Sequence, residues 1–162
     1  MAIRTGRFFV LMLTACLAAA CSPDSEITSE GEYLFFERIG IGQASSVRDT
    51  TEWVIRDSLS WVQASPQFQP LAPFDPVSWS QSMVLAVGIP TESGGYHIEI
   101  ESVEDLGEEV VVSYLFHVPA QDCIALQALA YPFQVVQVRR FDDKPVRFER
   151  RRQRYECTWK QN

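Results

Sequence analysis

Two histidines are the side chains in this sequence best suited to proton transfer or metal binding. His97 and His117 occupy two apolar, alternating stretches. If the turn between these stretches centres on Gly107, the two imidazoles face each other across adjacent strands, with Glu99 on the same face. Two imidazoles and one carboxylate can hold zinc or another transition metal. A one-residue shift in pairing would separate them, and a solvated polar face is the ordinary alternative.

The sequence lacks the motifs of common catalytic sites. It contains no Gly-x-Ser-x-Gly nucleophile elbow, no His-Glu-x-x-His metal motif and no glycine-rich phosphate loop. Glu99 and Glu101 share a strand face, as acidic pairs commonly do in an acidic protein. We therefore assign no catalytic residue, no metal ligand set and no cofactor, and we expect a protein that binds rather than catalyses.

The strongest candidate for a binding site is a loop ahead of the first histidine. Glycines permit a tight, exposed backbone, and loops on a rigid sheet commonly carry binding residues. The loop is similar to the Asn-Pro-Thr-Thr-Gly-Tyr loop of chagasin-type cysteine-protease inhibitors, but it lacks the leading Asn and has two extra residues. The alternative is a bend that carries no function. The loop consists of Pro90, Thr91, Glu92, Ser93, Gly94, Gly95 and Tyr96.

Alternating apolar residues predict the strands that position these side chains. Ile98 and Ile100 fall on one face of an extended strand and His97 on the other, because strand side chains alternate. Residues 105–108 form the expected turn of a hairpin. Further strands are predicted at 82–88, 110–118, 123–129 and 133–141, with a weaker one within 145–159.

The first half of the chain predicts one helix. A strand at 33–39, a loop at 40–42 and a short strand at 47–48 come first. Asp49-Thr50-Thr51-Glu52 fits a capping box, and the spacing of Trp53, Leu59 and Trp61 predicts a helix from about residue 50 to 64. Four prolines within 65–79 indicate an extended connector. The predicted fold class is α+β, a mainly antiparallel β-sheet with one helix packed on it.

Several short motifs resemble the C-terminal domain of the PrcB family, named for a lipoprotein subunit of a surface protease complex. That family typically shows Pro-Thr-Gly-Gly-Tyr, an Ile-x-Ile strand and Gln-Ala-Leu-x-x-Pro-Tyr. Two departures are an insertion of Glu92-Ser93 and a Phe in place of the last Tyr, which removes a hydroxyl. The resemblance also implies a helix with paired tryptophans, matched by Trp53 and Trp61. The matching residues are Pro90-Thr91, Gly94-Gly95-Tyr96, Ile98 and Ile100, Gln127-Ala128-Leu129 and Pro132-Phe133.

The N-terminus reads as a lipoprotein signal. Arg4 and Arg7 precede an apolar run that ends in small residues at position 20. Both Cys16 and Cys21 follow sequences like a lipoprotein cleavage box, but Cys16 would leave a short apolar core. We expect residues 1–20 to be the signal, Cys21 the lipidated residue, 21–32 a flexible tether and 33–162 a single PrcB-like domain. An ordinary secretory signal is the alternative.

Charge is distributed unevenly along the chain. The formal net charge is −7, which argues against nucleic acid as a partner. Residues 139–162 hold nine of the 14 basic residues and only four of the 21 acidic ones. This basic segment either neutralises the acidic remainder of the chain or forms a strip for an acidic partner or a lipid surface.

Two cysteines remain beyond the signal. In an oxidising compartment, Cys123 and Cys157 are expected to form a disulfide bond that stabilises the fold by on the order of 3 kcal/mol. The alternative is a pair of buried thiols.

The sequence thus predicts a bacterial envelope lipoprotein, lipid-anchored in the outer membrane. Its expected function is binding of a protein partner, with an envelope protease as the candidate, through 90–96 and an adjacent sheet edge. The alternatives are a protease inhibitor acting through the same loop, and a structural envelope lipoprotein.

Overall fold

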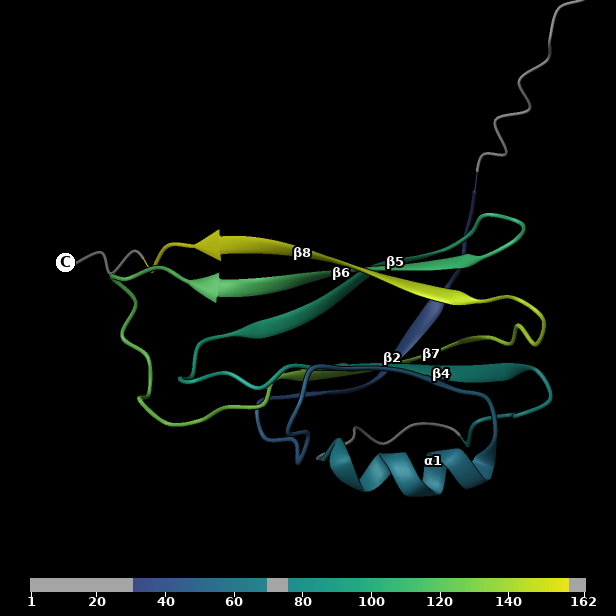
Figure 1. Ribbon diagram of the computed structural model, residues 1–162, viewed down its shortest axis with the longest axis horizontal. Helices are drawn as coiled ribbons and strands as arrows, with labels where there is room; N and C mark the ends of the chain where they lie inside the picture. The colour runs from purple at the N-terminus through teal and green to yellow at the C-terminus, as the bar shows by residue number, and fades with distance from the viewer. Residues whose placement is uncertain (1–30, 70–75, 158–162) are drawn as a thin grey trace, which may run out of the picture.

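A computed structural model of the chain describes residues 31–69 and 76–157 (Figure 1). The predicted signal, Cys16, Cys21 and the tether up to residue 30 lie outside these residues. The described part begins just before a strand that includes Glu32, a residue that had been assigned to the tether.

The described strands form two four-stranded sheets that lie one above the other (Figure 1). Sheet A has the order β1 (Glu32–Tyr33), β5 (His97–Asp105), β6 (Val110–Pro119) and β8 (Val146–Tyr155). Sheet B has the order β2 (Phe36–Gly42), β7 (Phe133–Arg139), β4 (Ser82–Gly88) and β3 (Thr51–Ile55). The expectation of a mainly β protein with one helix is confirmed, whereas the expectation of a single sheet is wrong.

The main core lies between the two sheets. Met83, Leu85 and Val87 of β4 point into this layer and share it with apolar residues of β5, β6 and β7. The intervening residues Val84 and Ala86 point to the opposite face of sheet B and belong to a second cluster. Strand β4 is therefore apolar at nearly every position, because both of its faces are covered.

The second cluster covers the far side of sheet B. It includes Phe68, Phe133 and, from helix α1 (Ser58–Ala64), the buried Ala64 and the partly buried Trp61. Figure 1 shows α1 below sheet B, on the side away from sheet A. A 3-10 turn, Ser65–Gln67, continues the helix.

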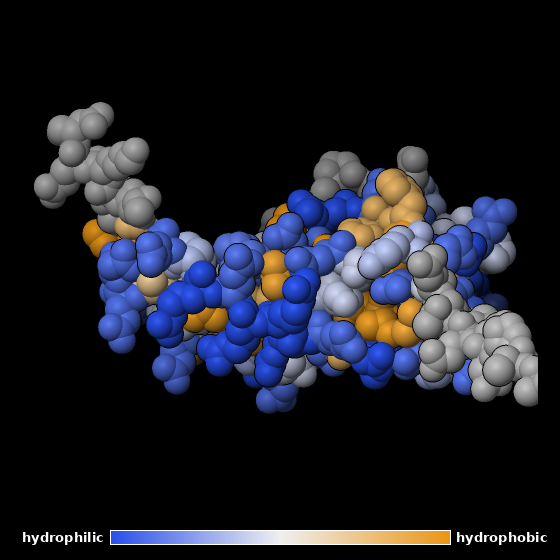
Figure 2. All heavy atoms as spheres, turned by 90° about the horizontal axis from the view of Figure 1, so that it is seen from above, coloured by the Kyte–Doolittle hydropathy of each residue, from blue (hydrophilic) through white to orange (hydrophobic). Residues whose placement is uncertain are grey.

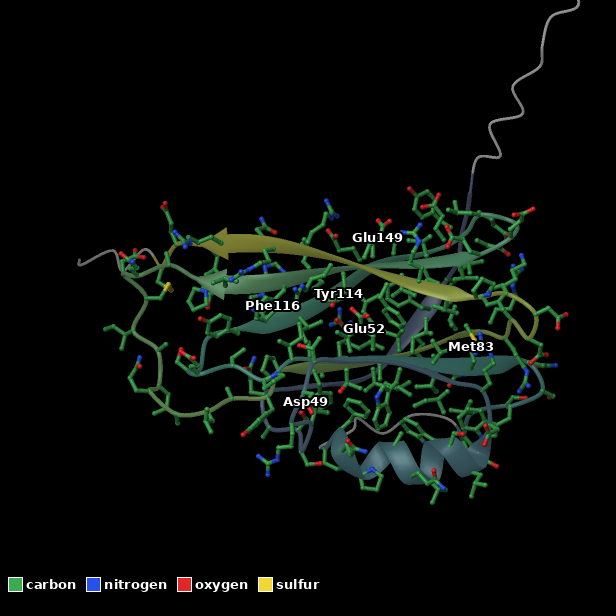
Figure 3. The ribbon with its side chains drawn as sticks, in the orientation of Figure 1. Asp49, Glu52, Met83, Tyr114, Phe116 and Glu149 are labelled. Atoms are coloured by element: carbon green, nitrogen blue, oxygen red, sulfur yellow. A yellow bond between two sulfur atoms is a disulfide. The ribbon has the colours of Figure 1, made fainter. Side chains whose placement is uncertain are left out.

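Polar contacts of two buried side chains, Tyr114 and Gln134, join the two sheets. The Tyr114 hydroxyl of β6 donates to Glu52 Oε1 of β3 at 2.6 Å, and the two side chains meet between the sheets in Figure 3. Gln134 of β7 is fully buried, and its Oε1 accepts a 2.7 Å bond from the Ile100 backbone N–H of β5. These contacts fix the sheets relative to each other more specifically than apolar packing does.

The predicted helix start at 49–52 is wrong. Residues Thr51–Ile55 form β3, which pairs antiparallel with β4. The helix begins later, capped by Asp57, whose carboxylate accepts from the Ser60 N–H at 2.8 Å. A β-branched and aromatic segment beside β4 gains more from sheet pairing than from an isolated helical turn, so tertiary context overrides the local capping pattern.

The N-terminal strand predictions also need correction. The predicted strand at 33–39 is divided between β1 in sheet A and β2 in sheet B. Residues 40–42, predicted as a loop, continue β2, where a Cβ on Gly42 would lie 2.6 Å from Phe133 Cε1. Residues 47–48 form no strand, although Val47 is buried in the second cluster.

The last strand departs from the expected antiparallel arrangement. Strand β8 pairs with β6 in parallel, with Val110 opposite Val146 and Pro119 opposite Tyr155. A parallel neighbour requires a long crossover, and here the chain crosses to sheet B and back as β7.

Candidate functional site

The two histidines meet as the sequence predicts. His97 and His117 are direct cross-strand partners in the β5–β6 pair. Their rings stack with centroids 3.9 Å apart and planes 9° apart. Glu99 Oε2 lies 3.1 Å from His117 Nε2. Partial burial, followed by the nearby charge of His117, lowers the pKa of His97.

This arrangement forms a stacked surface pair with one carboxylate. Within residues 31–69 and 76–157, no group of three His, Cys, Asp or Glu side chains is placed to hold a metal ion. The stacked imidazoles lie on the outer face of sheet A.

A hollow of about 430 Å³ lies between β3 and α1. Its polar lining includes Glu52, Ser60 and Gln63. Two of these groups have partners already: Glu52 accepts from Tyr114, and the Ser60 hydroxyl donates to Asp57 Oδ2 at 2.8 Å. Among the described residues, neither a histidine nor a cysteine lines the hollow.

The loop 90–96 is attached to the segment before β7. Thr91 and Ala130 form an antiparallel bridge with reciprocal N–H···O bonds of 2.8 and 3.1 Å. The Thr91 hydroxyl, in a side chain that is nearly buried, donates to the Ser93 and Ala130 carbonyls. Thr91 is therefore a structural residue that fixes the start of the loop, and its side chain is not available to a partner.

Two hydrogen bonds, one to Leu126 and one to Tyr155, hold the Gly94-Gly95 pair in place. The Gly94 N–H donates to the Leu126 carbonyl at 2.8 Å, and the Gly95 carbonyl accepts from the Tyr155 hydroxyl of β8 at 2.5 Å. Gly95 has φ +90°, a backbone conformation that L side chains rarely adopt. The Gly94-Gly95 pair thus forms a braced bend, and the loop residues that reach solvent most openly are Glu92 and Gly95.

Tyr96 ends the loop and returns it to the core. Its ring stacks on Phe116 with centroids 5.5 Å apart, and its carbonyl accepts from Gln43 Nε2 at 2.6 Å. The ring is partly buried against the main core. Tyr96 therefore anchors the loop to sheet A.

The predicted strand at 123–129 is wrong, and the error is informative. This segment forms bends and irregular backbone, and none of the described strands pairs with it. Three large apolar side chains on it reach solvent: Ile124, Leu126 and Leu129 are 86%, 76% and 70% exposed. We call these three residues the apolar triplet. In the sequence, the spacing of Ile124 and Leu126 resembles that of a half-buried strand, so the exposure of these side chains could be recognised only from the fold.

The apolar triplet is held close to the loop 90–96. The Leu126 carbonyl accepts from the Gly94 N–H, and the expected disulfide bond joins Cys123, at the start of the segment, to Cys157, two residues beyond β8. Exposed apolar side chains on a braced backbone lose little conformational freedom when a partner covers them. The loop and the triplet together make a preorganised surface with apolar side chains beside a polar loop.

Comparison with known proteins identifies one family. Residues 83–139 match the family model described as PrcB C-terminal. This stretch runs from β4 to β7 and contains the loop 90–96, the histidine pair and the apolar triplet. The resemblance drawn from the sequence is confirmed over this stretch. No curated protein and no solved structure matches the chain.

Proposed function

We propose that this chain with a PrcB-like central region is a non-catalytic binding subunit of an envelope protease complex. The family match supports a role in association with a protease complex. The observation that carries the proposal is the apolar triplet, because three large exposed side chains lie on a short segment held by a disulfide and a backbone hydrogen bond.

The proposed docking surface combines the triplet with the exposed part of the loop 90–96. Covering one Leu or Ile side chain contributes about 1.5–3 kcal/mol, so three such side chains can supply the centre of a specific interface. Exposed Glu92 lies on the loop, exposed Asp122 immediately precedes the segment 123–129, and both would form part of a polar rim.

The same geometry favours docking over inhibition by insertion into a protease cleft. An inserting loop must present its own backbone and side chains to the protease. Here Thr91, Gly94 and Gly95 use their polar groups to hold the loop against the rest of the molecule. Residues 90–96 therefore fit a role in positioning the neighbouring apolar triplet better than insertion into a protease cleft.

Attachment to the outer membrane through lipidated Cys21 is part of the same proposal. It is supported by the arginines, the apolar run and the small residues at the N-terminus. No helix among the described residues is long and apolar enough to cross a bilayer. Anchoring would then come from acyl chains, and stable anchoring requires more than one of them.

The test is crosslinking capture from envelopes with the tagged full-length lipoprotein, read by mass spectrometry. We expect a protease to co-purify with the wild-type chain and to be lost with Leu126→Asp. Leu59→Asp on α1 is the matched control, because Leu59 is similarly exposed at 68% and lies outside the proposed surface. Circular dichroism verifies that both variants fold.

Two results would overturn the proposal: capture that Leu126→Asp leaves intact, or capture of abundant lipoproteins and porins without a protease. The second result would favour a structural envelope protein. If a protease is captured, its activity in the complex separates the subunit from the inhibitor, since an inhibitor lowers the activity and a docking subunit does not.

A further inference from the structure

Strand β8 leaves one long backbone edge open. In sheet A its only neighbour among the described strands is β6 (Figure 1). The carbonyls of Pro145 and Tyr155 accept from Val110 and Ala120, so the odd-numbered residues direct their backbone groups toward β6. Since these groups alternate in direction along a strand, the even-numbered residues direct theirs to the free edge. That edge is unusually long, because β8 has ten residues.

The arginines of β8 fall into two rows with different surroundings. The odd-numbered row faces the outer side of sheet A, which is predominantly hydrophilic (Figure 2). There Arg147 binds Glu109 at 3.0 Å and also Glu149, and Arg151 binds Glu101. In this row the arginines are therefore neutralised by acidic side chains, which was one of the two alternatives for the basic segment.

The even-numbered row consists of Arg150, Arg152 and Arg154. None of them has a carboxylate within 4.0 Å in the part of the chain that the structure describes. They continue the face of Val146 and Phe148, which pack against the main core. Arg152 lies over the Phe116 ring at 5.9 Å, and all three arginines are exposed.

The even-numbered residues of β8 thus carry both the unpaired backbone groups and the arginines that lack a carboxylate partner among the described residues. Each of the three offers an outward N–H and C=O, and each also places a guanidinium on the inner face. Side chains two residues apart on a strand are spaced by about 6.6 Å, which matches alternate residues of any strand added beside it.

We propose that the β8 edge binds an extended polypeptide with acidic residues at alternate positions. The added strand would pair its backbone with the even-numbered residues of β8, and its carboxylates would accept from Arg150, Arg152 and Arg154. Backbone pairing supplies affinity for any strand, whereas the arginine row selects an acidic one. A second copy of β8 is disfavoured at this edge, because it would bring arginine against arginine.

This proposal rests on β8 alone and goes beyond docking through the apolar triplet. The simpler alternative is that the arginines only keep the open edge from pairing with other chains, as charged residues on edge strands commonly do. The two ideas differ in their prediction for one ligand, an extended acidic peptide.

The experiment measures binding of a labelled Glu-Val alternating peptide to the mature chain by fluorescence anisotropy, with a block peptide of the same composition and an alternating Lys-Val peptide for comparison. We expect the alternating acidic peptide to bind most tightly and to weaken as salt rises. Changing Arg150, Arg152 and Arg154 to Gln should weaken it by at least about tenfold. Arg147→Gln with Arg151→Gln is the matched control on the neutralised row and should change it little.

Hydrogen exchange on the wild-type chain adds a readout that requires no variant. The expected result is peptide-dependent protection at the amides of 148, 150, 152 and 154. No binding, equal binding of the block peptide, or binding without this protection would each overturn strand addition at β8. Leu126→Asp should bind the peptide as wild type does, so failure here is distinguishable from failure of the proposed docking surface.

Discussion

Tyr114 and Glu52 join the two sheets through a single hydrogen bond of 2.6 Å between a fully buried tyrosine and a carboxylate on an edge strand (Figure 3). Tyr114→Phe removes the donor and should lower the free energy of unfolding by about 1–2 kcal/mol, because the bond is to a charged acceptor. Urea denaturation measures the change. Tyr131→Phe is the control: its hydroxyl accepts a hydrogen bond from the exposed Arg48, and the expected change is within about 0.5 kcal/mol. Equal effects would show that Glu52 contributes nothing to sheet association.

The same contact predicts how the stability of the fold changes at alkaline pH. Burial, followed by the hydrogen bond to Glu52, raises the pKa of Tyr114 above its ordinary value near 10. The folded state therefore keeps the phenol protonated where the unfolded state releases its proton. This contribution to stability is fully present below about pH 10 and is lost as pH rises further. Tyr114→Phe should flatten that part of the wild-type stability profile; an unchanged slope would contradict the assignment.

For His97 we expect a loss of stability at acidic rather than alkaline pH. Burial and the adjacent His117 lower the pKa of His97, while Glu99 opposes the shift. The unfolded chain then binds a proton more readily, so this stability is present above the ordinary histidine value of 6.5 and is lost as pH falls below it. The difference in unfolding free energy between wild type and His97→Gln, followed from about pH 7.5 to about pH 5, should shrink or reverse toward the acid end. A difference that does not vary with pH would rule out this role.

Gly94 and Gly95 should respond differently to alanine. Gly95→Ala forces a side chain onto a residue with φ +90° and should cost about 1–2 kcal/mol. A Cβ on Gly94 would lie 3.5 Å from Leu126 Cβ, an ordinary contact, so Gly94→Ala should have a much smaller effect. Thermal or urea unfolding of the two variants makes the comparison. Similar losses of stability would mean that the bend accepts alanine equally well at both positions.

The disulfide should matter for stability and for the docking surface together. Replacing Cys123 and Cys157 with Ser removes a cross-link over 34 residues and should cost about 3 kcal/mol. It also frees the segment that carries Leu126, so the Gly94 amide should exchange faster. Unfolding experiments and hydrogen exchange measure the two effects, and reduced wild-type protein should behave like the variant. Faster global unfolding with an unchanged Gly94 amide would separate the disulfide from the loop.

The hairpin was predictable because its determinants are local. Gly107, with φ +90° and an N–H bonded to Asp105, sets the turn, and a register shift between Ile100 and Ser102 then brings His97 opposite His117. The run in β4 likewise carries its own signal, since a strand covered on both faces is apolar throughout. The hairpin and β4 therefore follow from neighbouring residues, whereas the pairing of the two histidines also depends on the register shift within the hairpin.

The predictions of secondary structure are wrong where a partner distant in the sequence determines the structure. Glu52 fits a capping box, yet it lies in a strand and contacts Tyr114 of the other sheet. Ile124 and Leu126 are spaced as in a strand, yet none of the described strands pairs with residues 123–129, and the exposed apolar side chains of this segment form the proposed docking surface. The parallel partner of β8 depends on a crossover through sheet B. None of these choices is encoded in a window of ten residues.

The position of β8 has a consequence for solubility during folding. Strand β6 reads VVVSYLFHVP, a β-prone segment without Asp, Glu, Lys or Arg, and β8 covers its second edge. Until the last strand arrives, that edge is open to β6 of another chain, and segments of this composition form intermolecular cross-β contacts readily. Once β8 is in place, the sheet ends in a row of like charges. A chain truncated after Arg139 would thus expose an aggregation-prone edge permanently, and the C-terminal strand would be required to keep the protein monodisperse.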